Sequence, residues 1–287
     1  MRRTSELLHL GALKASVWLC VALVPFATSR ATAQPAGTLF PAPGAKGVCP
    51  DTPLLIRFPN TPVAGVGRIE VRDSADDSVV ATIDVASPTR TRTIGGLPNF
   101  RDHPVIISGG EAAILLPEHT LGYNKTYSVR VDAGAFKDPT GVPDAGVDDA
   151  GSWRFSTRPA PPAAGSRRIT VAADNSGDFA TVQGALDSIP EGNTVPTTIF
   201  IRSGTYREIV CFTGKHAVTL LGEDRKKTVI AYANNDRLNH NAGGNPFGPD
   251  AGPPGAANPW RGGAECTCHT ERIGPVHVSV AATLPAA

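Results

Sequence analysis

The chain has 287 residues, which is enough for one large domain or for two of ordinary size. Lys and Arg (27) nearly balance Asp and Glu (26), and a formal charge of +1 excludes both a broad basic field for nucleic acid and an acidic tail. Hydrophobic residues (41%) allow a buried core, while abundant Gly (30) and Pro (26) favour strands and loops over helices.

The first 33 residues have the pattern of an export signal. Arg2 and Arg3 are basic, Val17 to Ala27 is mostly apolar, and Ala31-Thr32-Ala33 offers the small-x-small site that signal peptidase requires. The apolar stretch is shorter than the roughly 20 residues that span a bilayer, which argues against a membrane anchor. We expect a secreted or periplasmic protein that is not bound to a membrane once the signal is removed.

Four cysteines remain after the predicted cleavage, namely Cys49, Cys211, Cys266 and Cys268. In an oxidising compartment they allow three disulfide connectivities, among which the sequence does not choose, and unpaired thiols are an equally open alternative. Cys266-x-Cys268-His269 is suited to a soft metal, but a closed zinc site needs four ligands. We therefore predict neither a metal site nor a cofactor.

Residues 38–158 are predicted to form a β-sandwich, because short β-rich runs alternate there with turn clusters. The runs are Leu54–Phe58, Arg68–Val71, Val79–Ile83 and Tyr127–Val131, and the turns are Pro59–Pro62, Asp73–Asp76 and Gly95–Pro98. Trp153 and Phe155 alternate on a final strand, so that both face the core; a sugar-binding platform at Trp153 is the alternative.

This segment resembles the bacterial Ig-like modules that are attached to exported enzymes and surface-layer proteins. The resemblance is carried by the runs L-F-P-A-P-G-A-K-G-V, L-G-Y-N-K-T-Y and G-S-W-R-F-S-T. It implies an N-terminal Ig-like β-sandwich. Residues 159–166 follow as a Pro-rich linker, which stays extended because proline fixes φ and removes backbone donors.

From Arg167 onward the pattern indicates a parallel β-helix with one capping helix. The helix is expected to begin at Asp178 and to bury Phe179, Val182, Leu186 and Ile189. Four short strands are expected, at Ile169–Ala172, Thr197–Ile201, Val218–Gly222 and Thr228–Ala231. A doubly wound sheet would need further crossover helices, and none is predicted. Residues 240–287 are predicted to be a loop-like or disordered tail.

The stretch from Ile169 to about Leu238 resembles the opening of the pectin methylesterase (pectinesterase) family. Its matching runs are I-T-V-A-A-D-N-S-G-D-F-A-T-V-Q-G-A-L-D-S-I-P, T-T-I-F-I-R-S-G-T-Y-R-E-I-V and V-T-L-L-G-E-D-R-K-K-T-V-I, and the second contains the G-x-Y-x-E signature at Gly204, Tyr206 and Glu208. The resemblance implies an all-β chain in which the sandwich precedes an incomplete right-handed parallel β-helix (residues 167–239). It also implies hydrolysis of the methyl esters of polygalacturonate in cell wall pectin.

Two roles remain open for Tyr206 and Glu208. The first is structural, with Tyr206 packed in the interior and Glu208 hydrogen-bonded at a corner between coils. The second is substrate binding, in which both side chains line the sugar groove. We predict these two residues as the substrate-binding residues of this chain.

No catalytic residue is predicted. The family's chemistry uses two aspartates, glutamine side chains and an arginine from later motifs of the forms Q-A, Q-D-T, D-F-x-F-G and G-R-x-W. The chain's only glutamines, Gln34 and Gln183, precede the signature, and neither Asp236 nor Asp250 lies in such a motif. Pro259-Trp260-Arg261-Gly262 has the wrong order for the arginine motif.

The leading hypothesis is a secreted pectinesterase-family protein that is truncated or frame-shifted and inactive. Its partner is pectin or a polygalacturonate-type polysaccharide, with no nucleic acid, and the chain is expected to be monomeric. One alternative is a non-enzymatic module that binds carbohydrate or protein through the Ig-like domain. Another is a small enzyme with a novel site at His269 or His277.

Overall fold

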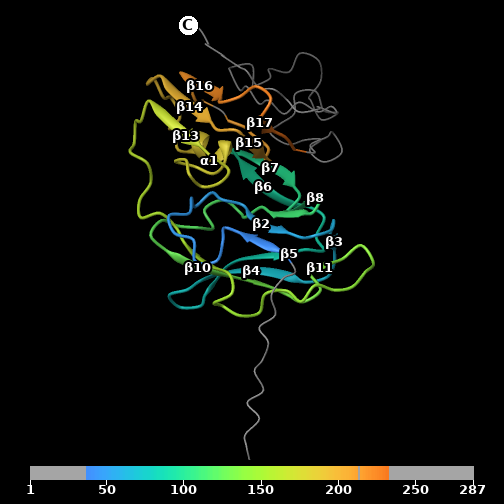
Figure 1. The fold of residues 1–287 in the computed structure, drawn as a ribbon. Helices are drawn as coiled ribbons and strands as arrows, with labels where there is room; N and C mark the ends of the chain where they lie inside the picture. The colour runs from blue at the N-terminus through green and yellow to red at the C-terminus, as the bar shows by residue number, and fades with distance from the viewer. Residues whose placement is uncertain (1–36, 213, 233–287) are drawn as a thin grey trace, which may run out of the picture. The chain divides into compact units, whose positions relative to one another are not determined.

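The computed structural model describes residues 37–212 and 214–232, all of which belong to one compact unit (Figure 1). The predicted signal peptide, the tail and the Cys266–His269 segment lie outside the described residues. The strands are β1 (Thr38–Phe40), β2 (Leu54–Arg57), β3 (Val63–Ala64), β4 (Arg68–Asp73), β5 (Val79–Asp84), β6 (Arg90–Ile94), β7 (Leu97–Asp102), β8 (Val105–Ser108), β9 (Glu111–Ile114), β10 (Thr126–Val131), β11 (Phe136–Lys137), β12 (Arg154–Ser156), β13 (Arg168–Val171), β14 (Thr197–Ile201), β15 (Gly204–Tyr206), β16 (Val218–Gly222) and β17 (Thr228–Ile230), and the one helix among the described residues is α1 (Val182–Asp187). The described part of the chain is therefore nearly all β, as the sequence predicted.

Residues 37–158 contain two four-stranded antiparallel sheets. One has the strand order β1-β2-β9-β8 and the other β12-β10-β4-β5. Alternate residues of both sheets, such as Ile56 and Val71, are fully buried in one shared core. This follows from the period-2 pattern of apolar residues, which directs every second side chain inward.

Trp153 and Phe155 lie in this core, as their alternation predicted. Both side chains are buried, and the indole N–H of Trp153 donates to the carbonyl oxygen of Pro41 at 2.9 Å. Because the indole is enclosed by protein, it cannot serve as a surface platform for a sugar ring.

The segment Gly95–Pro98, predicted as a turn, is a turn only at its two glycines. Leu97 already begins β7, which pairs with β6 in a two-stranded antiparallel hairpin. Gly95 has a φ of +58°, and a Cβ there would collide with the carbonyl oxygen of Cys211. Only glycine allows both this backbone conformation and this close approach. The hairpin thus contacts residues more than a hundred positions further along the chain.

Residues 168–232 form stacked parallel strands. The sheet β13-β14-β16 is parallel, with Ile169 beside Ile199 and Ile199 beside Leu220, and β15 pairs with β17 in the same sense. These side chains share a second core, into which Tyr206 also packs. Parallel pairing in register with a short repeat is what a β-helix requires, and it agrees with the strands predicted from sequence.

Helix α1 covers one end of this core, but it begins later than predicted. Thr181, rather than Asp178, is the N-cap, and its side-chain oxygen accepts the N–H of Gly184 at 3.0 Å. The carboxylate of Asp178 instead accepts the N–H of Thr170 at 2.8 Å. Asp178 and Thr181 are both good capping residues, and the bond that Asp178 makes to the neighbouring strand decides between them.

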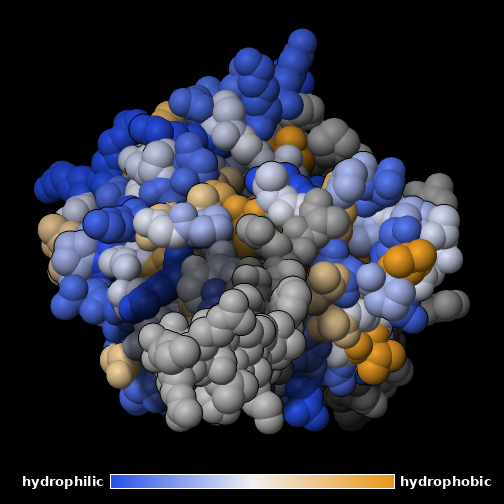
Figure 2. Space-filling model, turned by 60° about the horizontal axis from the view of Figure 1, so that its bottom comes forward, coloured by the Kyte–Doolittle hydropathy of each residue, from blue (hydrophilic) through white to orange (hydrophobic). Residues whose placement is uncertain are grey.

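The face of the molecule shown in Figure 2 is mostly hydrophilic, and its hydrophobic surface is confined to small separate patches. Over residues 37–212 and 214–232, no helix has both the length and the apolar character needed to cross a membrane.

Candidate functional site

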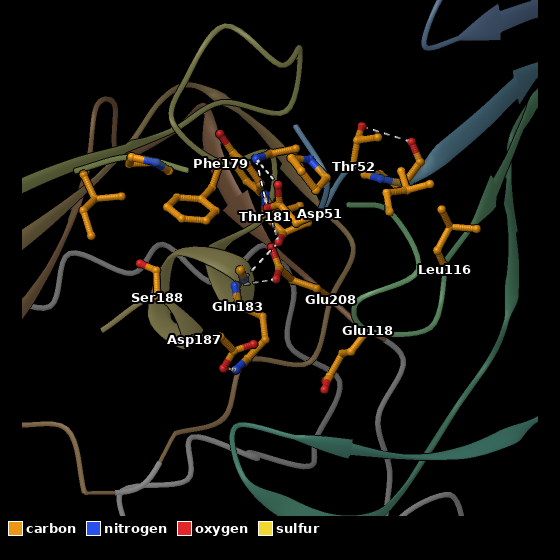
Figure 3. Close-up of a pocket in the computed structure, with 18 of the residues that line it drawn as sticks. Asp51, Thr52, Leu116, Glu118, Phe179, Thr181, Gln183, Asp187, Ser188 and Glu208 are labelled. Carbon is orange, nitrogen blue, oxygen red and sulfur yellow. Dashed lines mark hydrogen bonds between the residues drawn. The ribbon is translucent and has the colours of Figure 1, made fainter. Parts of the chain in front are cut away.

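A cavity of about 590 Å³ lies in the described part of the chain. Its walls come from the loop that precedes β2, from the segment between β9 and β10, from the predicted linker and from α1 with β15 (Figure 3). Most of the lining is apolar, and several carboxylates and two guanidinium groups project into it. A concave, largely apolar site with a few polar groups is the usual form of a small-molecule pocket.

Asp51 joins the first half of the chain to the start of α1. Its carboxylate accepts the N–H of Ala180 at 3.0 Å, the N–H of Thr181 at 2.8 Å and the hydroxyl of Thr181 at 2.7 Å. Figure 3 shows Asp51 directed at Thr181. Burial raises the pKa of Asp51, although these three donors act in the opposite direction. These donors hold the carboxylate of Asp51 against the start of α1.

Glu208, from the G-x-Y-x-E signature, meets the same helix from the other side. One carboxylate oxygen accepts the N–H of Val182 and the other the N–H of Gln183, each at 2.8 Å (Figure 3). These are backbone donors that the first turn of a helix leaves without partners. Burial raises the pKa of Glu208 to about 7. Glu208 is thus a buried cap of α1.

Tyr206 also points inward. Its side chain is buried in the core of the parallel strands, and its hydroxyl donates to the carbonyl oxygen of Arg202 at 2.9 Å. Burial raises the pKa of this phenol to about 12. The structure thus brings Tyr206 and Glu208 together at the cavity wall, with the polar atoms of both bonded to protein; their binding of substrate stays a prediction.

Gln183 lies at the same wall with both ends of its amide in use. Its oxygen accepts the N–H of Cys211 and its nitrogen donates to Asp187, each at 2.8 Å. These two bonds fix the amide of Gln183 between α1 and the backbone of Cys211.

Two further carboxylates, Glu118 and Asp187, reach the cavity from opposite halves of the chain (Figure 3). Burial raises the pKa of each, and their mutual repulsion adds to the shift of Glu118. Arg92 lies 3.8 Å from Glu118 but is also paired with Asp102 at 3.0 Å. A raised pKa suits a general acid, but the guanidinium beside Glu118 is shared with Asp102.

Sequence reasoning missed Asp51, Glu118 and Asp187 as members of one site. Asp51 and Glu118 lie far from Asp187 in the sequence and in no recognised motif, and Asp187 lies in a family run without a predicted role. No local signal indicated that folding brings these three carboxylates to one cavity.

Cysteine chemistry and metal binding have little support in the described residues. Cys49 carries a free, buried thiol whose pKa burial raises to about 12, which makes it a poor nucleophile and metal ligand. Cys211 is buried beside the β6–β7 hairpin. Within residues 37–212 and 214–232, no group of three or more His, Cys, Asp or Glu side chains is arranged to hold a metal ion.

The raised pKa of Glu208 predicts a specific pH dependence of stability. A carboxyl whose pKa rises from 4.5 to about 7 on folding stabilises the folded state fully below pH 4.5, and this contribution is lost as the pH rises through 7. The loss amounts to about 3 kcal/mol. We expect urea unfolding to show this fall in the parent chain between about pH 5 and pH 8. The variant Glu208→Gln, which cannot ionise, lacks it.

The control for this titration is Glu191→Gln, since Glu191 is exposed and has no hydrogen bond among the described residues. It should retain the pH dependence of the parent chain. Parallel pH profiles for the parent chain and Glu208→Gln would show that Glu208 does not titrate in this range.

The likeness to known proteins is confined to the second half of the chain. A family model described as pectinesterase matches residues 168–244. Pectinesterase 4 of Arabidopsis thaliana is 37% identical over 107 residues, which cover 33% of this chain and 17% of that protein. A pectinesterase of Petunia integrifolia is 44% identical over 62 residues, which cover 21% of this chain and 17% of that protein. The chain thus spans about a sixth of the length of these relatives.

Among solved structures, CopC from Methylosinus trichosporium OB3b is similar at a TM-score of 0.26 and 14% identity, covering 44% of this chain and 98% of that one. A likeness this low supports no argument about fold or function. The matched residues 168–244 include the G-x-Y-x-E signature and the parallel strands that stack around Tyr206. The chain therefore carries, in residues 168–244, a fragment of the pectinesterase family.

Proposed function

We propose that this chain is an exported pectinesterase-family protein that binds pectin-type polygalacturonate without hydrolysing its methyl esters. The observation that carries the proposal is the match of residues 168–244 to the pectinesterase family model, and it is supported by Tyr206 and Glu208 of that stretch, which line a cavity of about 590 Å³. The polar atoms of Tyr206 and Glu208 bond to protein. We therefore propose that these two residues contribute to substrate binding by fixing the shape of the cavity wall.

The proposed domain layout is the one predicted from the sequence. Residues 1–33 are the export signal, 38–158 an Ig-like β-sandwich, 159–166 a linker and 167–239 a partial right-handed β-helix. The Ig-like assignment is supported by the two antiparallel sheets that share one core. We further propose that the exported protein is a monomer outside the cytoplasm, free of membrane and nucleic acid.

The proposed lack of activity has two independent supports. Ester hydrolysis needs a nucleophile, a general acid and a stabiliser for the oxyanion. After Glu208 the sequence contains no glutamine and none of the family's aspartate motifs. At the cavity, the carboxylates of Asp51 and Glu208 accept backbone N–H groups at the start of α1, and the amide of Gln183 bonds to Asp187 and Cys211.

The experiment is methanol release from highly methyl-esterified pectin. We expect the purified full chain to remain at background, while a complete pectinesterase measured alongside releases methanol, because loss of an acid–nucleophile pair costs many orders of magnitude. Turnover that disappears in Glu118→Gln or Asp187→Asn, but not in the exposed-site control Asp148→Asn, would show that the cavity carboxylates do perform the chemistry.

Pectin binding is measured separately, because a protein can bind pectin without hydrolysing it. Binding of the full chain to immobilised pectin supports the proposal. Failure to bind either methyl-esterified or free polygalacturonate would overturn it.

A further inference from the structure

A second recess, of about 310 Å³, lies where three neighbouring parallel strands end. It is lined by Ala172, Ala173, Asp174, Arg202, Ser203 and Glu223. The register places Val171 beside Ile201 and Ile201 beside Gly222, so the residues that follow these strands come together. No residue of this recess lines the larger cavity except Ala173. The stacking of coils therefore builds a site that is separate from the one described above.

The charged groups of the recess are arranged with an arginine between two carboxylates. Arg202 donates to the hydroxyl of Ser176 at 2.9 Å, and none of the salt bridges of the described residues involves it. Its positive charge lowers the pKa of both Asp174 and Glu223, after the larger effects of Ser176 and Ser203. At neutral pH the recess thus holds two carboxylates and an exposed guanidinium.

A neighbouring serine holds each carboxylate in place. The Oδ1 atom of Asp174 accepts the N–H of Ser176 at 3.0 Å and its hydroxyl at 2.5 Å, and the Oε2 atom of Glu223 accepts the N–H of Ser203 at 2.8 Å. Among the described residues, no hydrogen bond reaches Asp174 Oδ2. These bonds orient the carboxylates and leave acceptors for ligand hydroxyls, while Arg202 remains a donor for a ligand carboxylate.

A rigid basic turn adjoins the recess. Arg225, Lys226 and Lys227 are consecutive and exposed, and Asp224 holds their backbone by accepting the N–H of Lys226 at 2.7 Å and of Lys227 at 3.0 Å. The carbonyl oxygen of Lys227 accepts the N–H of Gly204 at 2.9 Å, which fixes the turn beside Ser203. The turn therefore extends the positive charge of Arg202 along the surface.

We propose that this recess and the basic turn bind non-esterified uronate units of polygalacturonate. A hexuronate carries both features that the site matches, since its hydroxyls can donate to Asp174 and Glu223 and its carboxylate can pair with Arg202. The carboxylate of the next unit would meet the cations of residues 225–227. The polymer class rests on the proposed function, whereas the preference for the free acid rests on this site, because a methyl ester removes the charge that arginine recognises.

The test compares binding of polygalacturonate and of its fully methyl-esterified form to the full chain by calorimetry. We expect tighter binding of the free acid, and weakening of about tenfold or more in Arg202→Gln and in the triple variant R225Q/K226Q/K227Q, since each loses at least one charge-assisted contact. The matched control K46Q/K137Q/R154Q removes the same charge from other surface positions and should bind as the parent does. Thermal unfolding shows that each variant is folded.

Four outcomes would overturn this site. Unchanged binding in both Arg202→Gln and the basic-turn variant means that the uronate binds elsewhere, and equal loss in the control triple means that the attraction is a general charge effect. Equal binding of free and esterified polymer would leave the proposed function intact but remove the uronate site. Binding of neither polymer would overturn the proposed function together with the site.

Discussion

Glu208→Ala is expected to lower the free energy of unfolding by about 2–5 kcal/mol at pH near 6, where the buried carboxyl is largely neutral. The side chain bonds the N–H groups of Val182 and Gln183, and no other acceptor reaches them among the described residues. Each buried donor left without a partner costs about 1–3 kcal/mol. A typical domain has about 5–15 kcal/mol in total, so the loss is a large part of the whole.

Urea unfolding measures the loss, and amide hydrogen exchange locates it. The amides of Val182 and Gln183 should lose protection in Glu208→Ala, whereas Glu208→Gln, which keeps one carbonyl acceptor, should lose about half as much stability. Glu191→Ala is the matched control, because Glu191 is exposed. A stability change below about 1 kcal/mol in Glu208→Ala would mean that water replaces the carboxylate and that the cap is not structural.

Asp51→Ala should cost about 2–4 kcal/mol and should uncouple the two halves of the chain. Asp51 precedes β2, yet it accepts bonds from Ala180 and Thr181 at the start of α1. Its removal leaves these two amides without their acceptors, so they should exchange faster while Val182 and Gln183 stay protected by Glu208. Asp51→Ala should therefore speed exchange at Ala180 and Thr181, whereas Glu208→Ala should speed it at Val182 and Gln183.

The pH dependence of stability offers a further check on Asp51→Ala, because Asp51 interacts with Glu208. The charge of Asp51 raises the pKa of Glu208, so its removal should move the pH-dependent fall in stability to lower pH. Asp148→Ala is the control, since Asp148 is exposed and has no hydrogen bond in the described part of the chain. If the amides of Ala180 and Thr181 exchange at the parent rate in Asp51→Ala, Asp51 does not hold the two halves of the chain together.

The local pattern of the sequence was enough to predict most strands. Thr197–Ile201 and Val218–Gly222 were predicted at their observed bounds, because β-branched and apolar runs between turn residues favour short buried strands. The G-x-Y-x-E signature and its flanking runs also sufficed to identify the pectinesterase fragment, which the family match confirmed. Strand identity and family membership are both local properties of a chain.

The strands β6 to β9 are among those that were not predicted, and the turn at Gly95 and Gly96 explains why β7 was missed. Gly95 and Gly96 were interpreted together with Leu97 and Pro98 as one turn, whereas the chain reverses at the glycines and resumes pairing at once. The stability of this hairpin depends on contacts of Ile94 and Phe100 with Ile209, which lies more than a hundred residues away. Propensity within a short window cannot register such a contact.

The roles of the side chains at the site were decided by tertiary structure alone. The sequence by itself determined that Tyr206 and Glu208 belong to a family signature, but it left open whether they pack or bind sugar. Glu208 became a cap because α1 presents its unpaired amides to it, and Asp51 shares that helix start because the first half of the chain lies against it. A carboxylate takes its role from the donors that folding brings within about 3 Å, and those donors come from residues that are distant in sequence.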